Sequence, residues 1–286
     1  MRPLPDPALF RRRRLLDLLV QGISILTMLF GLFWLFWLLW GLLARGLPWL
    51  DLSIFYQATP PPGSPGGLGN AILGSVLLTA IALLIGAPSG ILAATYLSEF
   101  AGGSRVAPVI RFVNDILLSS PSIILGVFIY EIVVVRMGHF SGWAGSLALA
   151  LIALPIVVRT TEDMLRLVPG SMREAAAALG APQWKVTVSI VFRAARSGIL
   201  TGVLLAVARI SGETAPLLFT ALNNQFWSHS LNEPIANLPV VIFQFAMSPY
   251  DDWQHLAWAG AVLITLSILL INILMRLFLG TPESSH

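Results

Sequence analysis

The stretch ARISGETAP, residues 208–216, places two charged residues, Arg209 and Glu213, inside an otherwise apolar run. An arginine keeps its positive charge at physiological pH and can hold an oxyanion through two parallel N–H bonds. Glu213 could hold Arg209 in place and compete with such an anion, which would then be bound weakly enough to leave. Together with Ser211 and Thr214, this pair forms our candidate path for a negatively charged substrate.

The free-energy cost of placing Arg209 in a membrane depends on its depth. If an apolar helix begins near residue 198 on the cytoplasmic side, Arg209 lies about 11 residues in, or roughly 16 Å at 1.5 Å per residue. That is close to the middle of a hydrocarbon core about 30 Å thick, where an arginine costs at least about 2.5–3.5 kcal/mol. Glu213 would follow one helical turn later on the same face. We therefore expect this face to look into protein or into a water-filled path.

A purely structural role is the alternative for this pair, as an ion pair that locks its helix to a neighbour. Two arguments weigh against that role. Arginine before glutamate at this spacing is the weaker orientation within one helix. Replacing a buried ion pair with apolar residues is also often neutral or better for stability.

The elements that must position these residues are apolar helices. The chain has 286 residues, of which 56% are hydrophobic and only 11% charged, and its mean hydropathy is +0.82. Soluble domains are nearer a quarter charged, so the composition indicates an all-α, polytopic membrane protein. Six runs are candidates for membrane-spanning helices by length and hydropathy, at 16–44, 71–97, 109–135, 143–158, 197–222 and 256–279.

The distribution of Lys and Arg predicts the orientation of the chain. With the N-terminus in the cytoplasm, 14 of the 17 basic residues fall inside, Arg45 and Arg136 fall outside, and Arg209 alone lies within a span. Cytoplasmic segments carry the excess of basic residues, so we expect both termini to be cytoplasmic. The net charge of +3 is then an orientation signal, and no nucleic-acid partner is expected.

Nothing in the sequence indicates chemistry carried out by this chain itself. An ATP-binding loop needs the pattern G-x-x-x-x-G-K-[ST], whereas the only lysine, Lys185, follows Trp184. The chain has no cysteine, and its four scattered histidines show no metal-ligand spacing. We therefore expect no catalytic residue, no metal site and no bound cofactor. If the protein moves a solute uphill with ATP, another chain must hydrolyse the ATP.

The segment 159–196 is the largest cytoplasmic one and reads as a helix, a break and a second helix. Ser171 and Glu174 have the spacing of a capping box at a helix start. Gly180 suits the left-handed position that ends a helix, and Pro182 suits the first turn of the next. This segment is either an ordinary helical hairpin or a docking surface for a cytoplasmic partner.

The same segment resembles a known family. EAAAALGAPQWKVTVSI matches the EAA signature of binding-protein-dependent ABC importer permeases through Glu174, Ala175, Gly180 and Ile190. The resemblance implies a coupling helix seated in a cleft of an ATPase, with Glu174, Ala175 and Gly180 as contact or turn positions. The family pattern usually continues to a proline where this chain has Arg193, which leaves the geometry of the second helix open.

Three further stretches resemble the phosphate-specific permeases of that family: PSGILAATYLSEFA (88–101), SSPSIILGVFIY (119–130) and GILTGVLLAVARISGETAPLLFTA (198–221). The similarity extends over about residues 66–279. It implies a type I importer-like fold and a phosphate importer in a bacterial cytoplasmic membrane. The implied partners are a second permease subunit, an ATPase dimer that carries ATP and Mg, and an external phosphate-binding protein.

These observations predict a layout in three parts. Residues 1–65 hold a basic segment, the first span and a Pro/Gly-rich outer loop; 66–280 form a permease core of five spans; and 281–286 are a tail. Three rival functions remain: a permease for sulfate, molybdate or another solute, an ion-coupled secondary transporter, and a membrane scaffold without transport.

Several other residues read as structural. Pro88, Pro121 and Pro216 are expected to kink or break their spans. The glycine pairs 86/90 and 198/202 have the spacing of close helix packing. The charged pairs 111/115 and 131/136 lie near the ends of the third span, where snorkelling to the interface explains them.

Overall fold

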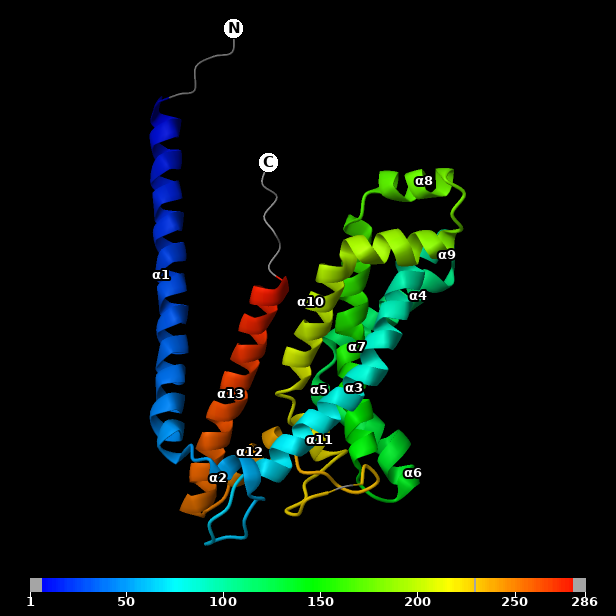
Figure 1. Cartoon of the computed structure of the whole chain (residues 1–286). Coiled ribbons are helices and arrows are strands. Elements are labelled where there is room, and N and C mark those ends of the chain that lie inside the picture. The colour runs from blue at the N-terminus through cyan, green and yellow to red at the C-terminus, as the bar shows by residue number, and fades with distance from the viewer. Residues whose placement is uncertain (1–6, 229, 280–286) are drawn as a thin grey trace.

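The structure is a computed structural model that describes residues 7–228 and 230–279, and in this part every regular element is helical. Figure 1 shows the elements as a bundle of long helices joined by short ones. Arg2 and the tail 281–286 of the expected layout lie outside the described residues.

Within residues 7–228 and 230–279, five helical stretches are long and apolar enough to cross a membrane. Three of them are the single helices α1 (Pro7–Gly46), α7 (Gly142–Leu167) and α13 (Asp251–Leu279). The fourth is α3 (Gly69–Thr95), which continues into the π-helical turn η2 (Tyr96–Phe100). The fifth runs from α9 (Gln183–Val186) through the π-helical turn η4 (Thr187–Val191) to α10 (Phe192–Ile210). The chain is therefore a multi-pass membrane protein.

The third expected span is broken. Helix α4 (Val106–Ser119) and the stretch Ser122–Met137, which comprises α5 (Ser122–Ile129), η3 (Tyr130–Val134) and α6 (Val135–Met137), meet at an angle of 107°. Pro121 causes the break, because the residue before a proline avoids the helical conformation and Ser120 is extended at ψ 135°. The predicted count of six spans is reached only if this bent pair crosses the membrane as one. The helix α3, by contrast, runs unbroken through Pro88.

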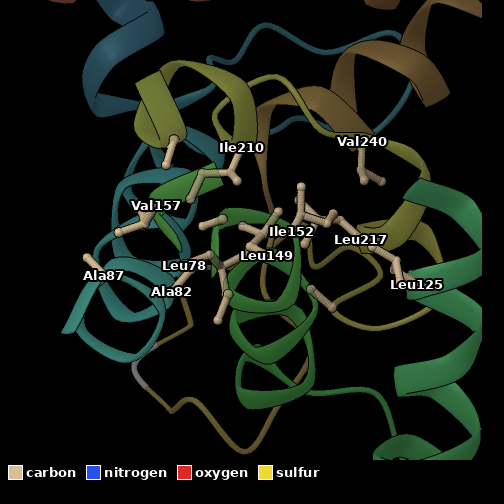
Figure 2. Packing of buried hydrophobic residues seen from close by; sticks show 14 residues of the cluster. Leu78, Ala82, Ala87, Leu125, Leu149, Ile152, Val157, Ile210, Leu217 and Val240 are labelled. Carbon is tan, nitrogen blue, oxygen red and sulfur yellow. The ribbon is translucent and has the colours of Figure 1, made fainter. Parts of the chain in front are cut away.

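Helix α7, the shortest of the predicted spans, is the most buried of the five. It packs against α3 and α10, and Figure 2 shows its side chains Leu149, Ile152 and Val157 among residues of both neighbours. Small residues permit this close packing. A Cβ added to Gly90 of α3 would lie 2.9 Å from the Cβ of Val157, and one added to Gly202 of α10 would lie 2.8 Å from the Cβ of Thr160. The predicted packing role of the glycine pairs is confirmed.

Helix α1 stands largely apart from the rest. None of the residues in the most apolar stretch of α1 is buried. The C-terminal end of α1 meets the first part of α13, as Figure 1 shows. There the guanidinium of Arg45 lies 5.0 Å from the centroid of the Trp258 ring, and Trp49 stacks on His255 at 3.7 Å between ring centroids.

The two ends of the bundle differ in what they carry. The start of α1, the short helix α8 (Gly170–Ala178) and the end of α13 lie at one end in Figure 1. The other end holds η1 (Leu47–Trp49), α2 (Ser53–Tyr56) and α12 (Leu238–Ala246) with their loops. This arrangement is the one that a chain with both termini on the cytoplasmic side requires.

Candidate functional site: a charged break in the bundle and a cytoplasmic hairpin

The candidate pair Arg209 and Glu213 lies where a helix ends. Helix α10 stops at Ile210, Ser211 is its C-cap, and Glu213 lies in the break before α11 (Ala215–Leu218). The break expected near Pro216 is therefore confirmed, whereas the expectation that Glu213 follows Arg209 by one turn on the same helical face is wrong. Gly212 favours an end to the helix, and Pro216 in the first turn of α11 has no N–H to donate to the carbonyl of Gly212.

The break nevertheless brings the two charges together. Nη1 of Arg209 donates to Oε1 of Glu213, and the two side chains differ sharply in exposure: 56% for Arg209 and 6% for Glu213. The carboxylate is thus seated in the protein, while the guanidinium reaches the surface of this chain. A guanidinium has five N–H donors. Since this ion pair engages one nitrogen, the group keeps donors with which to hold an anion.

Two interrupted segments meet at this place. A Cβ added to Gly126 of α5 would lie 2.5 Å from Cα of Pro216 in α11, so the two backbones are in direct contact. Helix α5 begins directly after the break at Ser120–Pro121, and α11 begins directly after the break that carries Glu213. Broken helices within a membrane are tolerated where they are buried in protein or line a cavity. The carboxylate of Glu213 is therefore buried where two interrupted segments meet, with the guanidinium of Arg209 at the surface of this chain.

The other two predicted path residues are arranged differently. The hydroxyl of Ser211 donates to the carbonyl of Val207, and Ser211 lines a hollow of about 330 Å³ between α3, α10 and α13, which neither Arg209 nor Glu213 lines. Thr214 is half-buried and precedes α11 without capping it through its side chain. Arg209 and Glu213 are thus paired with each other, whereas Ser211 faces the hollow between α3, α10 and α13.

The cytoplasmic hairpin consists of α8, the turn at Gly180 and α9. Helix α8 begins at Gly170 after Pro169, so Ser171 lies inside it and the expected capping box is wrong. The turn is as predicted: Gly180 has φ +79°, and the N–H groups of Gly180 and Ala181 bond back to the carbonyls of Ala177 and Ala176. Pro182 precedes α9 as its N-cap.

The three residues expected to meet an ATPase are all uncovered in this chain. Glu174, Ala175 and Gly180 are exposed, and the apolar side chains of Leu179 and Trp184 are exposed beside them at 89% and 63%. Arg193, at the usual proline position, is exposed and lies at the start of α10 in a helical stretch that runs without a gap from α9. The hairpin therefore presents a mixed polar and apolar surface.

Two ion-pair clusters in the same region were not foreseen. Glu162 on α7 is buried and accepts from Nε of Arg111 at 2.9 Å and from Arg166, and Arg111 also donates to the carbonyl of Leu97 at 3.2 Å. Arg111 is thus a structural link between elements rather than a snorkelling residue. The partners lie 51 positions apart, so sequence spacing offered no signal for the pair.

The second cluster joins Arg173 of α8 to Glu99 of η2. Nε and Nη2 of Arg173 donate to Oε2 and Oε1 of Glu99 at 3.0 and 2.7 Å. The hydrogen bonds to Glu99 hold the pKa of Arg173 above its usual range. This cluster fixes the hairpin to the rest of the chain.

Comparison with known proteins gives three kinds of match. Residues 86–280 match the family of binding-protein-dependent transport system inner membrane components. The phosphate transport system permease protein PstA of Pasteurella multocida is 58% identical over 276 residues, which cover 96% of this chain and 98% of that protein. The PstA protein of Haemophilus influenzae is 59% identical over 269 residues, with 94% and 95% covered. PstA 1 of Mycobacterium tuberculosis is 36% identical over 219 residues, with 74% and 70% covered.

Among solved structures, the fold resembles a chain of the inward-facing MetNI methionine ABC transporter, with a TM-score of 0.60 and 18% identity. The match covers 75% of this chain and 93% of that one. A chain of an amino acid ABC transporter gives a TM-score of 0.57 at 17% identity, with 73% and 91% covered. The sequence similarity is also longer than the predicted 66–279: its 276 aligned residues cover 96% of the chain and so extend into the first 65 residues.

Proposed function

This chain belongs to the family of binding-protein-dependent transport system inner membrane components, and we propose that it is the PstA-type permease subunit of an ATP-driven phosphate importer. It is a transport subunit rather than an enzyme. The high identity to PstA proteins over nearly the whole chain supports phosphate as the cargo.

The observation that carries the proposal is the asymmetric ion pair at the break between α10 and α11. Glu213 is seated in the protein and holds Arg209, whose guanidinium is more than half exposed on this chain. A permanent cation with unused donors suits a phosphate oxyanion, because guanidinium and phosphate form parallel, charge-assisted hydrogen bonds. In our proposal Arg209 lines the translocation path, Glu213 is its counter-ion, and Ser211 and Thr214 lie in the wall beside them.

Energy would come from outside this chain. The proposal places a PstB-like ATPase dimer, with its ATP and Mg, against the hairpin through Glu174, Ala175 and Gly180. A PstC-like second permease would complete the path, and a PstS-like binding protein would deliver phosphate at the outer face. We place the complex in the bacterial inner membrane, with residues 66–280 as permease core, 159–196 as coupling segment, and 1–65 as an added first span and outer loop.

The test is phosphate uptake by the assembled complex in vesicles. Arg209→Gln should abolish or strongly reduce uptake while the complex still assembles. Arg136→Gln is the control and should take up phosphate normally: Arg136 is also an exposed arginine, but it lies on α6, outside the assigned path and the coupling segment. Uptake at the normal rate by the assembled Arg209→Gln complex would refute the assignment of the path.

The cargo and the energy source need separate measurements. Competition by sulfate and molybdate during uptake by the wild-type complex tests the cargo, and phosphate uptake insensitive to both is expected. Withdrawal of ATP distinguishes an ATP-driven importer from an ion-coupled transporter: uptake that continues without ATP contradicts the proposal.

A further inference from the structure

The side chain of Arg173 points back into its own chain rather than towards a partner. Beyond the two bonds to Glu99, Nη1 donates to the carbonyl of Val168 and Nη2 donates to the carbonyl of Leu165 at 2.8 Å. Leu165 and Val168 belong to the C-terminal end of α7, where the last carbonyls lack the usual N–H donor four residues on; the carbonyl of Leu165 also accepts from the N–H of Val168 at 3.3 Å. Four hydrogen bonds thus occupy a group that has five donors, which leaves little of it for anything outside the chain.

Glu99 is likewise engaged by hydrogen bonds within its own chain. Its side chain is only 5% exposed, against 26% for Arg173, and Ser98 also donates to it at 3.0 Å. The backbone carbonyl of Glu99 accepts from the side chain of Gln183 in α9. Both arms of the hairpin, α8 and α9, are therefore tied to this one residue of η2.

Apolar contacts also hold the hairpin: Ala176 of α8 and Val186 of α9 pack in one cluster with Leu165 of α7. The hydrogen bonds of Glu99 tie the hairpin to η2 as well. A hollow of about 320 Å³ lies between the hairpin and η2, and Glu99, Arg173 and Gln183 all line it. A helix as short as α8, with nine residues, is also marginal by itself and depends on tertiary contacts for its position. The polar contacts of Glu99 thus fix α8 to η2, in addition to the apolar contact of Ala176 with the cluster around Leu165.

The turn η2 is anchored in the bundle on its other side. Arg111 of α4 donates to the carbonyl of Leu97 in η2 and, through Nε, to the buried Glu162 of α7. A displacement of α8 that is passed to Glu99 therefore reaches a turn that is bonded to α4. Helix α4 leads through the break at Pro121 to α5, which touches Pro216 beside the candidate site.

We propose that Glu99 and Arg173 are positioning residues that couple the ATPase-facing hairpin to the transmembrane helices. This inference rests on the proposed function. The bidentate pair makes α8 and the end of α3 move together, so that movement imposed on α8 opens or closes the path. Without the pair, the hairpin moves with the ATPase, but α3 no longer follows it.

The test is the number of phosphate ions transported per ATP hydrolysed by the full complex in proteoliposomes. Glu99→Gln removes the charge of the acceptor, and Arg173→Lys keeps the charge but cannot form the fork. Both variants should retain the ATPase subunit and hydrolyse ATP, while the ratio falls about threefold or more. Asp17→Asn, which removes the charge of an exposed carboxylate on α1 that accepts from Gln21, is the control and should leave the ratio unchanged.

An unchanged ratio in both variants would overturn the proposal, because a pair with only a local structural role does not affect it. A double variant covers the case in which the ATPase subunit is lost. The chain has no cysteine, so Glu99→Cys with Arg173→Cys can be bridged selectively by a short bis-maleimide. Bridging should restore the ratio; restored ATPase binding with a ratio that stays low would also overturn the proposal.

Failure of this inference can be told apart from failure of the proposed function. If the wild-type complex transports another oxyanion, the same ratio is measured with that oxyanion and the coupling test stands. If Arg209→Gln transports normally, the assigned path is wrong, but the effect of Glu99→Gln on the ratio is still decided by its own measurement.

Discussion

The contact between α7 and α10 allows a quantitative prediction at Gly202. A Cβ added there would lie 2.8 Å from the Cβ of Thr160 and closer still to its hydroxyl, whereas carbon atoms pack at about 3.5 Å. Thr160 cannot turn away freely, because its hydroxyl donates to the carbonyl of Ile156 at 2.8 Å. Gly202→Ala must therefore break that bond or move the helices apart.

The magnitude follows from opposing contributions. Loss of the hydrogen bond or strain at the contact costs about 1–3 kcal/mol, and the helix propensity of alanine over glycine returns up to about 1 kcal/mol. We expect Gly202→Ala to destabilise the protein by about 1–2 kcal/mol. Gly198→Ala meets Met164, whose flexible side chain can shift, so its cost should be below about 1 kcal/mol.

The assay is unfolding of the purified protein in detergent, by denaturant or heat. Gly41→Ala in α1 is the matched control, since nothing lies within 4 Å of an added Cβ there and the change should be neutral or slightly stabilising. Thr160→Ala should recover part of the stability lost in Gly202→Ala. The reasoning is refuted if Gly202→Ala is no less stable than Gly198→Ala, or if Thr160→Ala brings no recovery.

Two further substitutions test the hairpin and the outer segment. Gly180→Ala places a side chain at φ +79° and should cost about 1–2 kcal/mol of stability by backbone strain alone. The strained turn should weaken the binding of the hairpin to the ATPase, which a pull-down measures. The control is Gly170→Ala, in which the added Cβ lies 4.0 Å from Glu174, and this variant should bind the ATPase normally. Asn237→Ala removes the N-cap of α12, which accepts from Val240 at 3.1 Å, and should lower the free energy of unfolding by about 1–2 kcal/mol. Asn272→Ala, which loses an amide that donates to the carbonyl of Ile268 in the same helix, should change it far less. Equal losses for the two asparagines would contradict the capping argument.

The local features of the chain were mostly readable from residue types and spacing. Long apolar runs must satisfy their backbone internally in a membrane, so α1, α3, α7, α10 and α13 could be anticipated from hydropathy. Gly180 was placed correctly because few residues other than glycine adopt a left-handed conformation without strain. Ser171 was not, because Pro169 is the N-cap and the helix begins two residues earlier than the capping pattern implied.

The arrangement of the charges could not be read in the same way. The pair Arg209–Glu213 was found by its spacing, but its geometry depends on a helix end that hydropathy does not report. The contacts Arg173–Glu99 and Arg111–Glu162 join residues 74 and 51 positions apart. Such partners have no periodic signal, because their distance is set by how α3, α4, α7 and α8 pack.

The sequence by itself therefore determined the class, the five unbroken apolar helices, the absence of an ATP-binding loop and the two charged residues within an apolar run. These follow from hydropathy and residue chemistry, which act locally along the chain. Only the tertiary structure decided that Glu213 is buried while Arg209 is exposed, that α10 ends between them, and that Glu99 holds the hairpin. Burial and long-range pairing depend on which helices lie side by side. The spacing of residue types along a single sequence does not report which helices are neighbours.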